Sequence, residues 1–408
     1  MREDLDRWMA EDELDWILVV GPRQGSGDFQ YMTRGAHVHR GPVLKKRGEP
    51  AVLLYNPMEV EEAGKSGLAV VSLKELGLHE IARKESDPFR ALVLKRVRIF
   101  EYFGISGRVG MYGMVAASRY WHLMQELVRL LPDFKPVMPE GVGVITRARR
   151  TKDREELDLI ADVGRRACGV FAEIQDFLAT RPVSGGALQH DGQALTIGKL
   201  KGRLRACCAE RGLDESGQTI FAQGADGGRP HSFGNDLETI CLETPIVFDF
   251  FPRDIHTGYY FDMTRSFCLG GADEDYLRRW DLVHRAFTES MAALRPGVSN
   301  QEPQNVACQI FEDAGYSTSR SDPTADVGYT HSLGHGIGLD LHEAPSLSLA
   351  KSAAYTLEVG NVVTVEPGLY HPGQGWGIRI ENAVALTEEG IENLTHVPIE
   401  PVVAMRSV

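Results

Sequence analysis

The stretch PIVFDFFPRDIHTGYYFDMTR, residues 245–265, contains two strand-like apolar runs, and one carboxylate lies within or beside each of them, Asp249 and Asp262. Short runs rich in β-branched and aromatic residues predict β-strands. A short connection between two such strands would bring the two carboxylates together. A charged group among apolar residues is costly unless a partner compensates it. The stretch therefore predicts two core strands whose acidic residues require a partner.

A second segment, HSLGHGIGLDLHEAP at residues 331–345, combines imidazoles with glycines. The glycines allow the backbone to approach another group closely. His335 and His342 lie seven residues apart in this segment. A lone histidine is usually a structural core residue, but two of them in this setting are candidates for a functional site.

Two more strand-like segments supply further carboxylates. VVTVEPGLY, residues 362–370, is an apolar strand that ends at Glu366, and GIRIEN follows at residues 377–382. Side chains alternate between the two faces of a strand, so Arg379 and Glu381 share one face. The four segments together provide four carboxylates and at least one imidazole.

Four carboxylates in one core would repel one another strongly, and a bound cation resolves the conflict. Oxygen-rich ligation with one imidazole suits divalent ions such as Mn²⁺, Co²⁺, Fe²⁺ or Zn²⁺, whereas a structural zinc site would prefer thiolates. Two bridging carboxylates could hold two metals about 3.5–4 Å apart, an arrangement that generates a hydroxide nucleophile at neutral pH. The pattern therefore predicts a metal-assisted hydrolase.

Composition places the chain among soluble globular proteins. Its 408 residues are 43% hydrophobic and 25% charged, and the length allows two or three domains. The formal net charge is −13, which opposes a general role in binding nucleic acids. Residues 1–150 carry 23 Lys and Arg against 20 Asp and Glu, whereas residues 151–408 carry 21 against 37. The acidity therefore belongs to the C-terminal part.

The predicted elements indicate two domains. Residues 1–148 alternate strand-like runs with helical stretches, as in a small α/β domain, and the proline-rich segment 132–139 precedes the boundary that we expect near residue 148. A long helix is predicted to follow, with Asp153 and Glu156 as a capping box. Residues 149–408 then mix helices and β-rich stretches. The expected fold class is α+β.

The N-terminal residues, the apolar runs and the cysteines together indicate where in the cell the protein works. The N-terminal residues do not resemble a secretory signal, and no apolar run has the length that a membrane-spanning helix requires. The six cysteines show no CxxC pattern. We therefore expect free thiols, a reducing cytoplasmic setting and no membrane association.

The five candidate ligands Asp249, Asp262, His335, Glu366 and Glu381, in this order and motif context, resemble the metal-binding set of the M24 metallopeptidases. The blocks GHGIGLDLHEAP and VEPGLY…GIRIEN are most similar to the Xaa-Pro aminopeptidase and prolidase branch. The resemblance implies a pita-bread catalytic domain over 149–408. It also implies a creatinase-type N-terminal domain over 1–148, where YMTRG at 31–35 resembles that domain's signature.

The resemblance also implies a role for each ligand. Asp249 would be a terminal ligand of one metal, and His335 and Glu366 would bind the other. Asp262 and Glu381 would bridge the two ions. Glu366 would in addition be the general base that takes a proton from the attacking water and returns it to the leaving amine.

Three more residues receive roles by resemblance. His342, and His231 in the segment RPHS, would donate hydrogen bonds to the scissile carbonyl and to the tetrahedral intermediate. Arg379 would orient the neighbouring bridging glutamate. The implied reaction is hydrolysis of the bond between an N-terminal residue and a following proline, with two divalent ions, Mn²⁺ or Co²⁺ before Zn²⁺ or Fe²⁺. A homodimer is the expected assembly.

Alternatives and departures remain. Another metal-dependent enzyme of this fold, such as a dimethylsulfoniopropionate lyase, would carry an extra aspartate where this chain has Phe251. A non-enzymatic binding protein would not need the complete ligand set. The spacing between Asp249 and Asp262 is two residues longer than the family pattern, which indicates an insertion and makes Asp254 an alternative first ligand.

Overall fold

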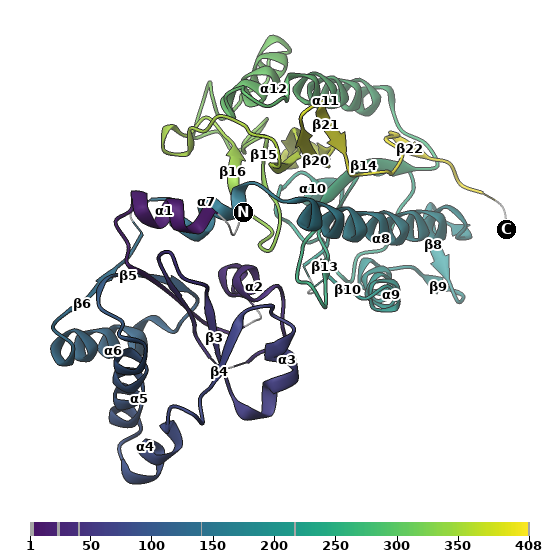
Figure 1. Ribbon diagram of the computed structural model, residues 1–408. Helices are drawn as coiled ribbons and strands as arrows, with labels where there is room; N and C mark the ends of the chain where they lie inside the picture. The colour runs from purple at the N-terminus through teal and green to yellow at the C-terminus, as the bar shows by residue number, and fades with distance from the viewer. Residues whose placement is uncertain (1–3, 23–24, 40, 140, 216–217, 407–408) are drawn as a thin grey trace. The chain divides into compact units, whose positions relative to one another are not determined.

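The computed structural model describes residues 4–22, 25–39, 41–139, 141–215 and 218–406 (Figure 1). The chain divides into two compact units, residues 1–149 and 150–408. The division falls inside helix α7, and the sequence analysis places a boundary near residue 148. Each unit contains its own cluster of buried hydrophobic side chains.

A six-stranded mixed sheet forms the centre of the first unit. Its strands follow the order β4-β3-β2-β1-β5-β6. All five residues of the central strand β1 are buried, as its sequence WILVV predicts. The strands are β1 (Trp16–Val20), β2 (Val43–Lys46), β3 (Val52–Tyr55), β4 (Ala69–Ser72), β5 (Gly107–Gly113) and β6 (Phe134–Val137).

Seven α-helices accompany this sheet in the described part of the unit. They are α1 (Leu5–Glu11), α2 (Gly27–Thr33), α3 (Val60–Gly64), α4 (Leu78–Lys84), α5 (Pro88–Phe103), α6 (Ala117–Leu130) and α7 (Val144–Arg150), with a short 3₁₀ turn, η2 (Pro57–Glu59). The predicted α/β character is confirmed. Strand β6 contains Pro136, which it tolerates because it lies at the edge of the sheet.

The second unit begins with the long helix α8 (Arg154–Ala179), and its predicted start is confirmed. The Asp153 side chain accepts a hydrogen bond from the Glu156 backbone N–H, and the Glu156 side chain accepts one from the Asp153 backbone N–H. On the buried face of α8, Phe171 stacks on Phe248 with ring centroids 4.4 Å apart. This contact places α8 against a four-stranded sheet of order β11-β12-β14-β22.

Strands of this unit form several small sheets. A five-stranded sheet has the order β16-β15-β17-β20-β21, and β18 pairs with β19. The strands are β7 (Val183–Ser184), β8 (Ala187–His190), β9 (Gln193–Ala194), β10 (Leu213–Asp214), β11 (Ile220–Gln223), β12 (Ile246–Phe250), β13 (Arg253–Asp254), β14 (Met263–Leu269), β15 (Gly334–Gly336), β16 (Glu343–Leu347), β17 (Val362–Val365), β18 (Gly368–His371), β19 (Trp376–Arg379), β20 (Asn382–Thr387), β21 (Gly390–Asn393) and β22 (Val402–Val403).

Helices lie on both sides of these strands. In Figure 1, α11 and α12 lie on the side opposite α8, with β14, β20 and β21 between them. The main core of the unit lies where α11 and α12 meet β17, β19 and β20. The remaining helices are α9 (Ile197–Glu210), α10 (Gly224–Gly227), α11 (Glu274–Ala293) and α12 (Gln301–Asp313), with 3₁₀ turns η3 (Lys351–Ala353) and η4 (Pro372–Gln374). The expected α+β architecture is confirmed.

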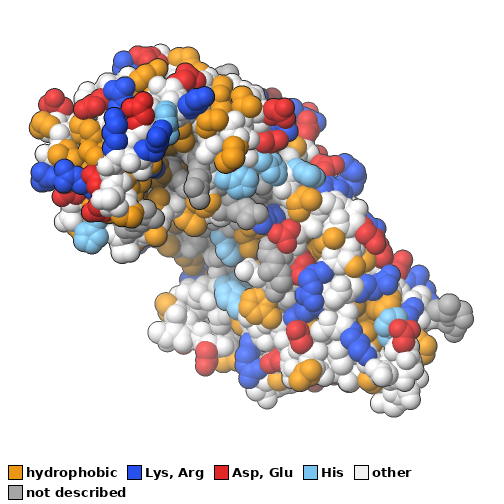
Figure 2. Space-filling view, turned by 90° about the horizontal axis from the view of Figure 1, so that it is seen from below, with side chains coloured by type: hydrophobic (Ala, Val, Ile, Leu, Met, Phe, Trp, Pro, Cys, Tyr) orange, Lys and Arg blue, Asp and Glu red, His pale blue; other side chains and the backbone are white. Residues whose placement is uncertain are grey.

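Surface and thiol chemistry agree with the composition. Acidic and basic side chains are interspersed over the face shown in Figure 2. All six cysteines are free, as predicted. Within the described residues, no helix is both long and apolar enough to cross a membrane.

Candidate metal centre

One cavity in the second unit, here called the metal cavity, is lined by all eight residues to which the sequence analysis gives a site role. Its volume is about 590 Å³, within the range of small-ligand sites. The candidate residues along its wall are His231, Asp249, Asp262, His335, His342, Glu366, Arg379 and Glu381. Segments far apart in the sequence therefore converge on one site.

Strand pairing brings the two aspartates to this cavity. β12 and β14 are antiparallel, with Asp249 opposite Thr264, and Asp262 directly precedes β14. The sequence analysis expected this juxtaposition. The connection between the two strands contains the short strand β13, which pairs with β10.

The imidazole reaches the same cavity on β15, which pairs with β17. Glycine at position 334 is required, because a Cβ there would lie 2.0 Å from the Thr364 carbonyl oxygen. Glu366 directly follows β17, and Glu381 lies between β19 and β20. Close backbone packing around His335 therefore explains why the segment 331–345 is rich in glycine.

Asp262, His335 and Glu381 form the tightest group. Their ligand atoms all lie within 4.8 Å of one another. His335 Nε2 lies 3.5 Å from Asp262 Oδ2 and 3.6 Å from Glu366 Oε1. His335 Nδ1 lies 3.1 Å from the Gly336 carbonyl oxygen. If Nδ1 donates to that carbonyl, Nε2 presents its lone pair to the carboxylates, as in a metal-ligating histidine.

Three carboxylate oxygens in this cluster have no hydrogen-bond partner among the residues that the structure describes. Asp249 Oδ1, Asp262 Oδ1 and Glu381 Oε1 are buried and accept no hydrogen bond from the described part of the chain. Buried polar atoms are rarely left unsatisfied in native proteins. Divalent cations prefer such oxygen donors, and one imidazole completes the set. The residues present therefore fit divalent metal ions.

The raised pKa values of the clustered carboxyl groups also support a cation site. Burial, with repulsion from Asp249 and Glu366, raises the pKa of Asp262 well above its usual range. Burial and repulsion from Asp262 do the same to the pKa of Glu381. Burial and Glu381 raise the pKa of Glu366 to about 8. Without a cation these carboxyl groups hold protons at pH values where ordinary carboxylates are ionised.

Arg379 contacts the cluster at Asp249 rather than at Glu381. Its Nη2 donates to Asp249 Oδ2 at 2.5 Å, and its Nη1 donates to the Tyr370 hydroxyl at 2.7 Å. It reaches Glu381 only through Thr264, whose hydroxyl lies 3.2 Å from Arg379 Nε and donates to Glu381 Oε2 at 2.7 Å. Arg379 therefore orients one carboxylate directly and a second one through a hydroxyl.

Two neutral imidazoles, those of His342 and His331, lie near the candidate metal ligands. The rings of His342 and His335 meet edge to face, with centroids 4.1 Å apart. Burial and His335 lower the pKa of His342 to about 4. Burial and Arg379 lower the pKa of His331 to about 3, and its Nε2 lies 2.9 Å from the Tyr370 hydroxyl. At neutral pH these rings can donate an N–H without carrying charge. His231 is exposed at the rim.

The sequence analysis assigned no role in the site to Tyr370 or to Thr264. Both hydroxyls connect Arg379 to its neighbours. Tyr370 lies in the quoted segment 362–370, so its position four residues after Glu366 was the available signal. A hydroxyl in a strand gives no comparable signal, because its partner depends on which strand lies opposite.

Asp254, the alternative first ligand, does not line the metal cavity. Its Oδ1 accepts hydrogen bonds from the backbones of His256 and Thr257, and its Oδ2 pairs with Arg166 at 2.7 Å. Burial alone would raise its pKa, but the hydrogen bonds from Thr257 and Arg166 lower it. Asp254 thus stabilises the inserted turn and has no oxygen in the carboxylate cluster.

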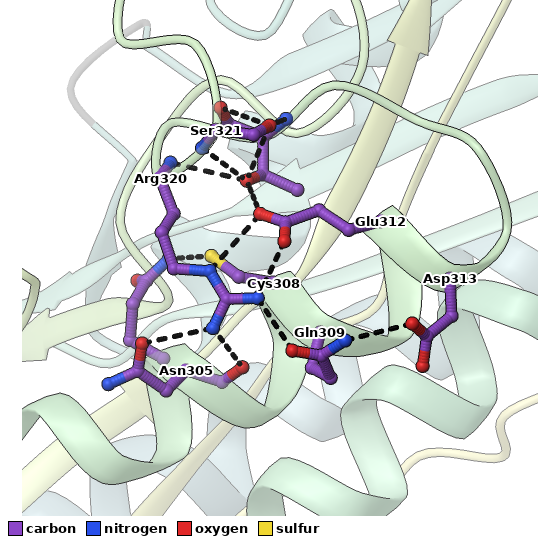
Figure 3. A network of polar contacts seen from close by, with 9 residues as sticks. Asn305, Cys308, Gln309, Glu312, Asp313, Arg320 and Ser321 are labelled. Atoms are coloured by element: carbon purple, nitrogen blue, oxygen red, sulfur yellow. Dashed lines mark hydrogen bonds and ion pairs between the residues drawn. The ribbon is translucent and has the colours of Figure 1, made fainter.

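A second polar cluster, here called the α12 clamp, lies outside the cavity lining (Figure 3). Arg320 donates from Nε and Nη2 to the two oxygens of Glu312, at 3.1 and 2.6 Å. It also donates to the side chains of Asn305 and Gln309. Residues 305, 309 and 312 share one face of α12, so a single guanidinium ties the following loop to the helix. The hydroxyl of Thr318 donates to the same glutamate.

The family model described as metallopeptidase family M24 matches residues 158–388. This range includes every candidate site residue. The probable dipeptidase PepE of Mycobacterium tuberculosis is 28% identical over 274 residues. The match covers 67% of this chain and 66% of that protein, which is just under two thirds. The Xaa-Pro dipeptidase of Pyrococcus furiosus is 27% identical over 96% of this chain and 97% of its own length.

Solved structures show the same architecture. The Xaa-Pro dipeptidase from Bacillus anthracis superposes with a TM-score of 0.77 over 98% of both chains, at 23% sequence identity. This likeness confirms the expected pita-bread fold of the catalytic unit, with a separate α/β region before it.

Proposed function

The chain belongs to metallopeptidase family M24, and from this premise we propose that it is a dinuclear peptidase of Xaa-Pro specificity. It would hydrolyse the bond between an N-terminal residue and a following proline. The relatives named Xaa-Pro dipeptidase support this substrate class. The first listed relatives are matched over just under two thirds of their length, so substrate and partners belong to the proposal.

The observation that carries the proposal is the set of three buried carboxylate oxygens that accept no hydrogen bond from the described residues. They belong to Asp249, Asp262 and Glu381, and they line the same cavity as His335 and Glu366. We assign Asp262 and Glu381 as bridges, Asp249 as a terminal ligand of one ion, and His335 with Glu366 as ligands of the other. Bound divalent ions polarise a carbonyl and lower the pKa of water.

The chain's own residues carry the remaining steps. Glu366 accepts a proton from the attacking water and returns it to the leaving amine. His342 and His231 donate hydrogen bonds to the carbonyl oxygen as it gains negative charge. Arg379 holds Asp249 in place and, through Thr264, limits the movement of Glu381. A neutral His342 suits this donor role, since its lowered pKa keeps the ring uncharged.

Ion identity, assembly and setting are further parts of the proposal. Mn²⁺ or Co²⁺ suit an oxygen-rich set with one imidazole, with Zn²⁺ and Fe²⁺ as the alternatives. Residues 1–148 would form a creatinase-type domain and residues 149–408 the catalytic domain, in a homodimer. The six free cysteines support a reducing, cytoplasmic location.

The competing lyase activity lacks support in this cavity. The position where those lyases would carry an additional aspartate is Phe251, an apolar residue of the cavity wall. A non-enzymatic binding role would give no purpose to the three carboxylate oxygens that lack a hydrogen-bond partner in the described chain, or to the neutral His331 and His342 near them.

The direct test combines metal analysis with a substrate panel. We expect about two divalent ions per chain after loading, and turnover of Xaa-Pro peptides that chelation abolishes and Mn²⁺ or Co²⁺ restores. Peptides without proline at the second position are the control. Turnover that persists after exhaustive chelation, or no turnover of any prolyl peptide after metal is restored, would refute the proposal.

A further inference from the structure

A buried ion pair joins the segment before α8 to the loop that carries His342. Lys152 Nζ donates a hydrogen bond to Glu343 Oε1 at 2.5 Å, and Glu343 directly follows His342 in the chain. The side chains of Lys152 and Glu343 are 2% and 6% exposed. Neither of them belongs to the lining of the metal cavity, whereas His342 does. The ion pair therefore lies outside the wall that a substrate would contact.

Glu343 fixes the loop between β15 and β16. Its Oε2 accepts a hydrogen bond from the Asp340 backbone N–H at 3.4 Å. Its carboxylate also packs against Gly338, where a Cβ would lie 2.5 Å from Glu343 Oε1. In the ladder between β15 and β16, Glu343 is paired with Gly336. One carboxylate thus contacts the loop at two points and fixes the backbone that leads into His342.

The backbone of Lys152 is itself anchored within the second unit. Its amide donates a hydrogen bond to the Gly360 carbonyl at 2.8 Å. The preceding residue, Thr151, forms an isolated β-bridge with Asn361. The following residue, Asp153, caps α8. Backbone contacts on both sides of Lys152 therefore fix the point from which its side chain reaches Glu343.

The His342 ring, by contrast, has few contacts of its own. The residue is exposed in the metal cavity. Its ring meets that of His335 edge to face, and none of the residues that the structure describes forms a hydrogen bond with it. The direction of the ring therefore depends on the backbone of residue 342 and on rotation about the side-chain bonds. A fixed backbone matters more for such a ring than for one that hydrogen bonds hold in place.

Stability alone does not account for an ion pair at this position. A buried pair gives up the hydration of both charges, and apolar residues of similar volume are often at least as stabilising. The pair does provide a defined geometry, because a shift of either side chain leaves the other charge buried and uncompensated. Geometry is what the loop before β16 requires if His342 acts on a substrate.

We propose that Lys152 is a positioning residue: through Glu343 it fixes the backbone of His342, so that the His342 N–H points to the scissile carbonyl. This inference rests on the proposed function, because the donor role of His342 belongs to that function. In this arrangement Lys152 contacts neither substrate nor metal. Its loss should weaken the contact that His342 makes in the transition state, whereas metal binding and ground-state binding of the substrate remain.

The test is a double-mutant cycle between Lys152 and His342, measured on Mn²⁺-loaded protein with Ala-Pro as the substrate. Lys152→Met should lower kcat on the order of 10-fold, less than the 10²–10³-fold that marks the loss of an oxyanion donor, with KM within about twofold and metal content unchanged. In the His342→Ala background the same substitution should change kcat by less than about twofold, because no ring is left to position. Lys152→Arg keeps the charge and should recover part of kcat.

The matched control is Lys45→Met in the first unit. Lys45 is also a buried lysine, 7% exposed, and its Nζ lies 2.5 Å from Asp6 Oδ1. This substitution should leave kcat unchanged in both backgrounds. Equal losses from Lys152→Met in the two backgrounds, or no loss in either, would overturn the inference. A near-normal kcat in His342→Ala would overturn it as well, because there would be no donor to position. If Lys152→Met does not fold, Glu343→Gln enters the same cycle with the same criteria.

A second measurement separates this inference from the proposed function. If the wild type turns over no prolyl peptide, the proposed function fails, and NMR of Zn²⁺-loaded protein with ¹³C-labelled histidine still tests the contact. The ring signal of His342 is identified by its absence from His342→Ala. It should move in Lys152→Met and stay in place in Lys45→Met. An unmoved His342 signal in Lys152→Met would overturn the inference whatever the kinetics show.

Discussion

The candidate metal ligands Asp249, Asp262, His335, Glu366 and Glu381, here called the metal cluster, differ from the α12 clamp in how their carboxylates are paired. Both groups combine acidic side chains with an arginine. In the clamp, both oxygens of Glu312 receive hydrogen bonds from Arg320. These bonds lower the pKa of Glu312, against a smaller opposing effect of burial. In the metal cluster, Arg379 serves Asp249, while one oxygen each of Asp249, Asp262 and Glu381 has no partner in the described chain.

The difference teaches how to separate a structural polar network from a binding site. A structural network is complete within the protein, because an unpaired buried charge costs several kcal/mol. A cation site is incomplete by design, and its carboxylates acquire raised pKa values when the ion is absent. Substitutions that remove one residue from each cluster therefore test whether the α12 clamp is complete within the protein and whether the metal cluster requires a cation.

The largest effect should come from the carboxylates that we propose as bridges. Asp262→Ala or Glu381→Ala would remove an oxygen donor from both proposed ions, so the protein should lose at least one metal. Activity should fall beyond the roughly 10³-fold that marks the loss of one oxyanion donor. Metal analysis and turnover of an Xaa-Pro peptide measure both. Asp254→Ala is the control, since Asp254 pairs with Arg166 outside the cavity and should leave metal content intact. Loss of metal in that control would reassign the first ligand.

A second prediction separates the two neighbouring histidines. His342→Ala removes a neutral N–H donor beside the cluster, so kcat should fall on the order of 10²–10³-fold while metal content is retained. His335→Ala should lose metal first, because its Nε2 faces Asp262 and Glu366. Metal analysis together with kcat distinguishes the two variants. A near-normal kcat in His342→Ala would show that the ring is structural and leave the donor role to His231.

A third prediction uses pH to expose the incomplete cluster. Burial and Glu381 raise the folded-state pKa of Glu366 to about 8, above its ordinary value of 4.5. Metal-free native protein therefore binds more protons than the unfolded chain between these values, and its free energy of unfolding should fall as pH rises from about 4.5 to about 8. The loss should be on the order of a few kcal/mol.

Metal-loaded protein should not show this decline, because ion binding favours the ionised carboxylates. Thermal unfolding of chelated and Mn²⁺-loaded samples across this pH range measures the difference. Parallel curves for the two samples would mean that the carboxylates are satisfied without a cation.

Local patterns explain why much of the fold and site followed from sequence. The capping box at Asp153 and the apolar periodicity of α8 are local signals, and both appear in the structure. Most candidate residues reach one cavity because they lie within or next to strands, whereas His231 lies in the loop between α10 and β12. Arg379 shows what the sequence could not predict, namely the direct hydrogen-bond partner of a side chain. It shares a strand face with Glu381, but its direct partner is Asp249, which strand pairing and side-chain reach determine.

The smallest effect should come from the complete cluster. Arg320→Gln removes a bidentate partner of Glu312, and the side chains are about one quarter exposed, at 29% and 24%. The free energy of unfolding should fall by about 1 kcal/mol, while metal content stays unchanged. Arg320→Lys should recover only part of this loss, since an ammonium group cannot reproduce the fork. Arg278→Gln, on the exposed surface of α11, should stay within about 0.5 kcal/mol of wild type. Chemical denaturation of the three variants measures the free energy of unfolding, and metal analysis measures the metal content.

A loss of metal in Arg320→Gln would show that the clamp and the metal cluster are coupled. The contrast between a complete and an incomplete network would then no longer separate structure from function.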